Sequence, residues 1–179
     1  MDRNLGASRA ATSSTEEQAY GDLYQWGRAA DGHQRRDSDK TSTISSSDQP
    51  DHGIFITSNS GANYDWRSPQ NDDLWQGVNG INNPCPPGYR LPAEAEWKAE
   101  RSSWSSNNLS GAFNSPLKLP LAGYRHSSNG SLGIVGSSGH YWSSTVSGSG
   151  VRRLYFDSND AYMTGNDRAL GVSVRCIKD

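Results

Sequence analysis

A proline-rich block at 84–92 constrains the fold of this chain more than any other sequence feature. Its first part, Pro84-Cys-Pro-Pro-Gly88, excludes a helix, because proline lacks an N–H and clashes with the preceding helical turn. Tyr89-Arg90-Leu91 then predicts a short strand. Pro92 stands where a helix begins, since a missing N–H costs nothing in the first turn. The block therefore predicts a strand followed at once by a helix.

Two helices are predicted. The first is short and begins after Thr15 as N-cap, with Glu16 and Glu17 at the positive end of the helix dipole. Its apolar face is expected to be Ala19, Leu23 and Trp26, with Tyr20 and Tyr24 alongside and Gly27 as the exit. The second runs from Ala93 to Arg101, with Ala95, Trp97 and Ala99 among its apolar contacts.

The last third of the chain predicts short strands separated by turns. These are Leu117–Leu119, Leu121–Tyr124, Ile134–Val135, Tyr141–Thr145, Leu154–Phe156 and Val172–Cys176. The first and last parts of the core should meet, with Tyr89–Leu91 and Val172–Cys176 in or beside one small sheet. The residues expected in the core are Trp97, Trp142, Leu154, Phe156 and Val174.

Length and composition favour one loop-rich domain over residues 1–179. Only 32% of the residues are apolar, but six Trp and eight Tyr supply the large buried areas that hold such a fold together. Residues 31–50 are polar and lack periodicity, which predicts a surface loop. The stretch from Ile54 to Ile81 is expected to be a long ordered loop pinned by Trp66 and Trp75.

The net charge of −2 gives no basic stripe for nucleic acid, and no apolar run is long enough to insert into a membrane. The four histidines are scattered, so no metal site and no cofactor are predicted. Cys85 and Cys176 are either a disulfide across a long loop or two buried thiols. Nothing here indicates the oligomeric state.

Three segments together resemble a known family. Asn83-Pro-Cys-Pro-Pro-Gly-Tyr-Arg-Leu-Pro-Ala-Glu-Ala-Glu-Trp97 is similar to the strand-to-helix signature shared by formylglycine-generating-enzyme-type domains and the Fibrobacter succinogenes major paralogous domain. Tyr20-Gly-Asp-Leu-Tyr-Gln-Trp-Gly27, and Tyr141–Thr145 together with Arg168–Cys176, resemble the second of these. The resemblance covers nearly the whole chain. Members of that family carry a strand and a Trp just before the piece that corresponds to Met1-Asp-Arg-Asn-Leu-Gly6, so this chain is expected to lack an N-terminal strand.

This resemblance implies an α+β, C-type-lectin-like fold with a small antiparallel sheet, two helices and long ordered loops. The same fold serves variable proteins of diversity-generating retroelements, in which a reverse transcriptase rewrites template adenines and the C-terminal part comes to bind different ligands. It implies a non-enzymatic, receptor-recognition protein on a virion or a cell surface, or a secreted one. The implied partner is a protein or a carbohydrate.

The residues between 137 and 176 agree with such diversification. Rewriting the adenines of an Asn codon cannot produce Lys, Gln, Glu, Met or Trp. From Ser147 to Asp167 only Met163 lies outside the reachable set, and no Lys, Gln or Glu occurs from Ser137 to Cys176. An ordinary Ser- and Gly-rich domain edge has a similar composition, so this pattern is an indication only.

Alternation within this region predicts the binding residues. Leu154 and Phe156 share one face of a strand, which leaves Arg153, Tyr155 and Asp157 on the other. Rigid aromatic rings, short polar groups and Arg are the residue types of adaptable binding surfaces. The predicted ligand-binding set is Ser147, Ser149, Arg152, Arg153, Tyr155, Asp157, Asn159, Asp160, Tyr162, Thr164, Asn166 and Asp167. The alternative is an ordinary polar surface.

Other functions fit the sequence less well. The cysteines are not the paired cysteines of a formylglycine-generating enzyme, and His140 near Ser143 lacks a nucleophile-elbow motif. Gln49-Pro50-Asp51 spells a galactose-type lectin tripeptide, but it precedes the strand-to-helix block, whereas the lectin motif follows it. Three short pairs are possible metal ligands but more typical of turns, namely Asp31-Gly32, Asp72-Asp73 and Asn166-Asp167. No catalytic residue is predicted.

Overall fold

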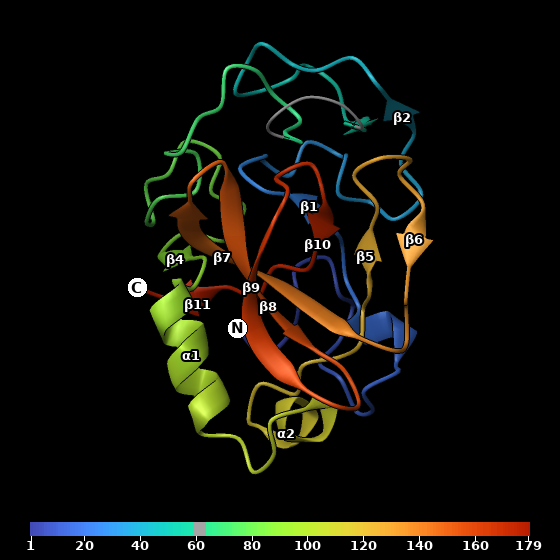
Figure 1. Cartoon of the computed structure of the whole chain (residues 1–179), viewed down its shortest axis with the longest axis vertical. Helices are drawn as coiled ribbons and strands as arrows, with labels where there is room; N and C mark the ends of the chain where they lie inside the picture. Colours follow the sequence, from blue (N-terminus) through green and yellow to red (C-terminus); the bar gives the residue numbers. More distant parts are fainter. Residues whose placement is uncertain (59–63) are drawn as a thin grey trace.

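The computed structural model describes residues 1–58 and 64–179, in which short helices and strands are joined by long loops (Figure 1). The helices are the 3-10 helix η1 (Glu17–Ala19), α1 (Glu94–Ser102) and α2 (Leu109–Asn114). The strands are β1 (Tyr24–Gln25), β2 (Lys40–Thr41), β3 (Phe55–Ile56), β4 (Tyr89–Arg90), β5 (Tyr124–Arg125), β6 (Leu132–Gly133), β7 (Gly139–Ser147), β8 (Gly150–Phe156), β9 (Ala161–Asn166), β10 (Gly171–Val172) and β11 (Ile177–Lys178).

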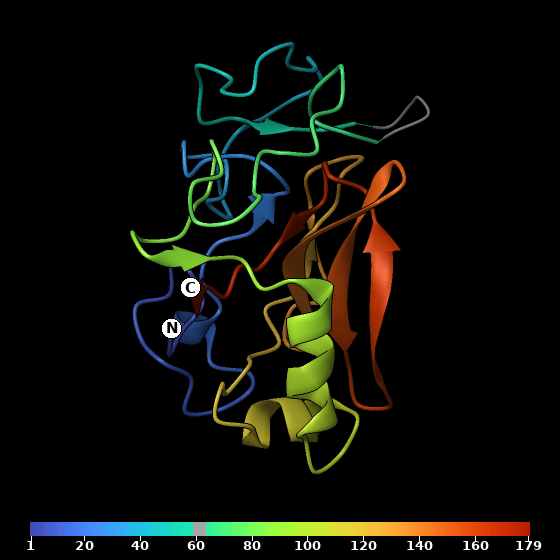
Figure 2. The same cartoon turned by 90° about the vertical axis from the view of Figure 1, so that its left-hand side faces the viewer.

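The strands form several small sheets, most of them antiparallel. One sheet has the order β1-β10-β5-β6, and the longest strands form a second with the order β7-β8-β9. Strands β4 and β11 pair antiparallel, and β2 and β3 pair parallel. Figure 2 shows the β7–β9 sheet at one side of the molecule, with α1 beside it. The expected α+β class is confirmed.

The proline-rich block forms the predicted strand and helix. The Glu96 carboxylate accepts a hydrogen bond from the Ala93 N–H (2.7 Å) and pairs with Arg90 (2.8 Å), which fixes the helix start against β4. Trp97 is buried, but Ala95 and Ala99 are exposed, so their expected role as apolar contacts is wrong. Residues two positions from Trp97 point away from the face that it occupies.

The predicted N-terminal helix after Thr15 is wrong except for one 3-10 turn. Gly21 adopts a positive φ of 66°, and a Cβ there would lie 2.2 Å from the Leu5 carbonyl oxygen, so the chain turns sharply at this point. Tyr24 then pairs with Val172 in the sheet. Pairing across the fold has overridden local helix propensity, although Leu23 is still buried as expected.

Four of the predicted strands differ in the structure, three of them in the segments before β7. Leu117–Leu119 and Leu121–Tyr124 are mostly irregular, because Lys118 has a positive φ of 49° and the amide of Leu121 bonds to a loop carbonyl at Ser14. Only Tyr124 of these two segments lies in a strand. The Ile134–Val135 strand is also wrong: β6 ends one residue earlier and Ile134 lies in a turn at a φ of 44°.

The C-terminal segment Val172–Cys176 changes its backbone partner at almost every residue. Val172 pairs with β1, Ser173 bridges to Tyr141, and the Cys176 carbonyl accepts from the Met1 ammonium (2.9 Å). It is therefore no single strand, and β11 follows it to pair with β4. This pairing brings the two cysteines together in a disulfide, with Cα atoms 5.9 Å apart. The two chain ends lie side by side (Figures 1 and 2).

Buried tryptophans hold the long loops to the core. Each buried indole N–H donates to a main-chain carbonyl, so the ring is buried without an unpaired donor. The tryptophans are Trp26, Trp66, Trp75, Trp97 and Trp142. Trp66 and Trp75 pin the loop from Ile54 to Ile81 as predicted, although residues 59–63 lie outside the described residues. All five residues predicted for the core are buried.

Candidate binding face of the C-terminal sheet

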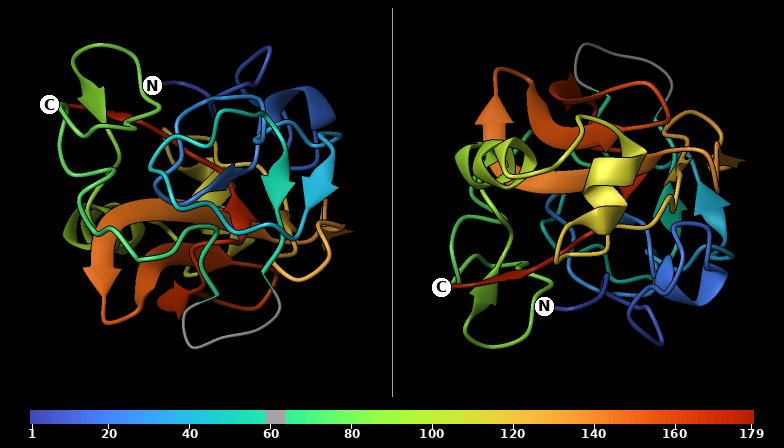
Figure 3. Two further views of the ribbon diagram at one scale, coloured as in Figure 1. Left: turned by 90° about the horizontal axis from the view of Figure 1, so that it is seen from above. Right: turned by 90° about the horizontal axis from the view of Figure 1, so that it is seen from below.

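The β7–β9 sheet buries one of its faces against the helices. Tyr141, Leu154, Phe156 and Ala161 pack there in one cluster with Trp97 of α1 and Ala112 of α2. Viewed from below, both helices lie over the strands (Figure 3). From Arg153 to Phe156 strand β8 therefore alternates as the sequence predicted, with Leu154 and Phe156 anchoring the sheet. At the start of the strand Val151, on the other side, is also buried, in the core cluster that contains Trp142.

The opposite side, which we call the aromatic face, carries Arg153, Tyr155, Tyr162, Thr164 and Asn166. Antiparallel pairing sets Arg153 opposite Thr164 and Tyr155 opposite Tyr162, so these side chains project to the same side. Tyr162 is 43% exposed and the other four are partly exposed. Five of the residues predicted for ligand binding are thus brought together.

A continuous row of rings crosses this face. The centroids of Tyr162 and Tyr155 are 5.0 Å apart, those of Tyr155 and His140 5.1 Å, and those of His140 and Tyr124 5.0 Å. His126 continues the row at 4.7 Å from Tyr124. Aromatic rings at such separations attract one another beyond their area burial. The row therefore runs from the exposed Tyr162 through the buried His140 to the β5 region.

Sequence reasoning missed three members of this row. His140 belongs to β7 and pairs with Tyr155, a relation that extending the alternation to β7 would have indicated. Tyr124 and His126 come from the β5 region, and nothing local in the sequence places them there. Gly133 makes room for both, since a Cβ at that residue would lie 3.0 Å from each of the two rings.

Arg153 is less accessible than the sequence predicted. Its Nε and Nη1 atoms are enclosed and have no hydrogen-bond partner among the described residues. Burial lowers the pKa of its guanidinium to about 10, and the neighbouring Tyr124 and Tyr162 offset only part of that effect. The expectation of a freely exposed side chain is therefore wrong at this position, because the tyrosine rings surround it.

Two carboxylates flank the face. Tyr155 donates its hydroxyl hydrogen to Asp157 (2.7 Å), which raises the pKa of Tyr155 to about 12 and lowers that of the carboxyl. Asp157 also accepts from the amides of Asn159 and Asp160 and so closes the β8–β9 turn. Asp167 follows β9, and burial raises the pKa of its carboxyl although Arg153 opposes this.

The remaining predicted residues lie elsewhere on the sheet. Arg152 projects to the helix side, where it donates to Glu94 of α1 (3.0 Å), so it does not join the aromatic face. Ser147 and Ser149 are exposed at the β7–β8 turn. Asn159 is exposed at the β8–β9 turn, whereas Asp160 accepts a hydrogen bond from Asn107 (2.7 Å).

The residues of the alternative catalytic and metal sites are engaged in hydrogen bonds and ion pairs within the fold. His140 bonds to the buried Ser138 (2.7 Å), not to Ser143, whose hydroxyl donates to the Arg152 carbonyl. Asp31 pairs with the buried Arg28 (2.6 Å), and Asp72 pairs with Arg168 (2.6 Å). Among the described residues no group of three His, Cys, Asp or Glu side chains could hold a metal ion. Nor does any described helix have the length and apolarity to cross a membrane.

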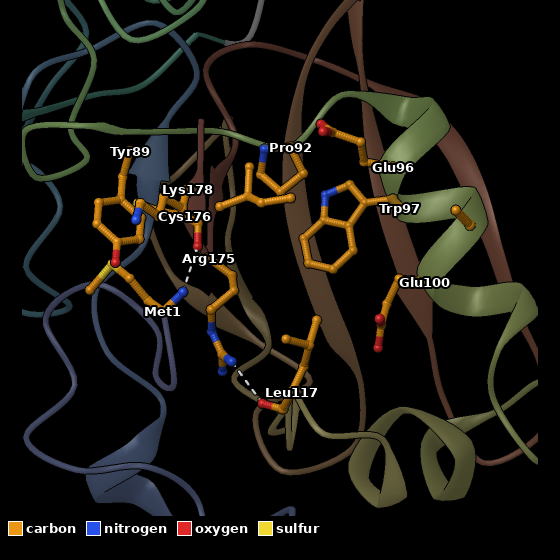
Figure 4. Close-up of a pocket in the computed structure, with 12 residues that line it drawn as sticks. Met1, Tyr89, Pro92, Glu96, Trp97, Glu100, Leu117, Arg175, Cys176 and Lys178 are labelled. Carbon is orange, nitrogen blue, oxygen red and sulfur yellow. Dashed lines mark hydrogen bonds between the residues drawn. The ribbon is translucent and has the colours of Figure 1, made fainter.

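A separate apolar hollow of about 450 Å³ lies between α1 and the chain ends (Figure 4). Trp97 and Glu100 form its helix wall, and Met1 and Arg175 stand opposite. The Arg175 guanidinium is already bonded, to the Leu117 carbonyl (2.7 Å) and to Asn4. None of the residues predicted for ligand binding lines this hollow.

Comparison with known proteins identified no relative of this chain. No family model matches the chain, and no curated protein or solved structure matches it either.

Proposed function

We propose that this chain is a non-enzymatic recognition protein that binds its ligand with the aromatic face, and that residues 137–176 are diversified by a retroelement. One observation carries the proposal: strands β8 and β9 bury Leu154, Phe156 and Ala161 on one side and gather Tyr155, Tyr162, Thr164 and Asn166 on the other. Side chains on that second side can change with little effect on the buried cluster.

The fold that we propose is the C-type-lectin-like one. Three features support it: the strand-to-helix block, the adjacent chain ends and the long loops pinned by tryptophan. The disulfide between Cys85 and Cys176 supports an oxidising location, such as a virion, a cell surface or the extracellular space. A non-diversified protein- or carbohydrate-binding domain of the same fold is the alternative.

Two experiments test the two halves of this proposal. In the genome, a near-copy of the 3′ coding end that differs only at adenines, beside a reverse-transcriptase gene, is expected. If the genome holds no such copy, the diversification half of the proposal fails and the chain is a non-diversified binding domain.

Binding is tested with a library that uses NNY codons at Tyr155, Tyr162, Thr164 and Asn166, panned against lysozyme and serum albumin. The expected result is protease-resistant protein throughout and capture that depends on the library sequence. A matched library at Leu154, Phe156 and Ala161 should lose folded protein, since these residues form the buried cluster. Equal loss of folding in both libraries would contradict the proposal.

A further inference from the structure

Arg153 of the aromatic face and the flanking carboxylate of Asp167 lie near each other without pairing. Arg153 and Asp167 influence each other electrostatically, yet no ion pair within 4.0 Å joins them. The Nε and Nη1 atoms of Arg153 have no partner among the described residues. Enclosed donors without partners are unusual, because a lost hydrogen bond to a charged group is costly. A ligand can reach this guanidinium through Nη2, which is not enclosed, and can there supply an acceptor that the surrounding side chains do not.

The charges nearby restrict what that ligand can be. An anionic group at Arg153 would approach the carboxylate of Asp167, and a cationic group would meet the guanidinium itself. A neutral ligand avoids both repulsions. It must accept hydrogen bonds from Arg153 and donate to Asp167, and each hydroxyl group does both. Neighbouring hydroxyls on one ring would satisfy the two side chains together.

The ring row restricts the ligand further. Tyr162 is 43% exposed, and its ring is tilted by 44° against that of Tyr155, which leaves a stepped aromatic platform beside Arg153. The C–H groups on one side of a pyranose pack against the electron-rich face of an aromatic ring. A stepped aromatic platform next to one donor and one acceptor is the polar and apolar arrangement that such a sugar needs.

We propose that the aromatic face binds a neutral pyranose, which stacks on Tyr155 and Tyr162, accepts from Arg153 and donates to Asp167. This inference rests on the proposed function, because it names the ligand class of the same face. The proposed binding requires no metal ion, unlike calcium-dependent sugar binding. The sequence predicted one ligand-binding set that includes Arg153, Tyr162 and Asp167, and here each of these residues has a different role.

The test is an NMR titration of the ¹⁵N-labelled chain with methyl glycosides of glucose, galactose, mannose and N-acetylglucosamine. At least one glycoside should cause saturable shifts at the amides of Tyr155, Tyr162 and Thr164 and at the Arg153 Nε. A sulfated heparin disaccharide serves as the anionic comparison and should bind at least tenfold more weakly. Preferred binding of that disaccharide would overturn the requirement for a neutral ligand.

Variants separate the proposed roles. Tyr162→Ala and Arg153→Met should each weaken glycoside binding at least tenfold while the remaining amide spectrum stays that of the folded chain. Tyr89→Ala, at a tyrosine that lines the hollow beside the chain ends, is the matched control and should bind as the wild type does. Equal weakening by all three variants would overturn the inference.

The outcomes distinguish the two proposals. If no glycoside shifts these amides while the NNY library still yields folded, sequence-dependent binders, the carbohydrate inference fails and the recognition function stands. If the library loses folded protein at the exposed positions, both fail.

Discussion

Replacing Arg153 by methionine should stabilise the protein, although most substitutions of partly buried residues destabilise. The guanidinium Nε and Nη1 atoms are enclosed without partners, and burial lowers the pKa of the group to about 10. A tenfold change in a protonation equilibrium equals about 1.4 kcal/mol, so this fall corresponds to a penalty of roughly 3 kcal/mol on the charged form. Methionine has a similar length, fills the space between the tyrosine rings and carries no charge.

The expected gain in the free energy of unfolding is about 1–3 kcal/mol, since the side chain remains partly exposed and water reduces the penalty. Urea denaturation at pH 7, followed by tryptophan fluorescence, measures it. The matched control is Arg168→Met. That guanidinium is also buried and its Nε likewise lacks a hydrogen-bond partner, but its two Nη atoms donate to Asp72 (2.6 Å) and to the Asn71 carbonyl (2.9 Å).

Arg168 also lies over the Trp26 ring, with its Cζ atom 4.6 Å from the ring centroid. Removing a partnered, buried cation should cost about 3–5 kcal/mol. The two arginines should therefore move stability in opposite directions. If Arg153→Met instead destabilises by more than about 1 kcal/mol, Arg153 is a structural residue like Arg168, and its assignment to the binding face is wrong.

Three further predictions concern the core. Trp142→Ala should lower the free energy of unfolding by about 3–5 kcal/mol, because the ring is fully buried and its N–H donates to the Tyr24 carbonyl; an unchanged thermal melt would contradict this. Replacing Cys85 and Cys176 by serine should cost about 2–5 kcal/mol in urea melts, since the bridge closes a loop of 91 residues; a loss below about 1 kcal/mol would show that the bridge constrains the unfolded chain little. Burial raises the pKa of Asp65 to about 6, so the folded chain binds a proton that the unfolded chain lacks, and Asp65 makes stability fall as the pH rises from about 4 to 6. Asp65→Asn should remove this fall of about 2–3 kcal/mol, and a difference between the two proteins that does not vary with pH would exclude it.

The sequence predicted the parts of the fold that depend on local chemistry. The proline-rich block could adopt few conformations, so the strand at Tyr89 and the helix around Trp97 follow from it. The alternation at Leu154 and Phe156 predicted which side of β8 is buried. The same local reasoning was wrong at residues 15–26. Pairing of Tyr24 with Val172, far along the chain, decides the structure there.

The candidate site was predicted only in part for a similar reason. Tyr155 and Tyr162 follow from the composition and alternation of one hairpin. Tyr124 and His126 reach the face through the contact between β5 and β7, which no local pattern encodes. Arg153 was correctly placed on a face but wrongly expected to be exposed. Its burial depends on rings contributed by several strands.

The central claim is that one side of the β8–β9 hairpin carries the fold and that the other, beyond the buried Val151 at the start of β8, carries the binding surface. Saturation mutagenesis from Gly150 to Asp167 tests it most directly, with the variants displayed on the surface of cells and scored by their resistance to protease. We expect tolerance at Tyr155, Tyr162, Thr164 and Asn166, within about 0.5 kcal/mol per site, and intolerance at the alternating positions Leu154, Phe156 and Ala161. A tolerance profile without this alternation would contradict the account.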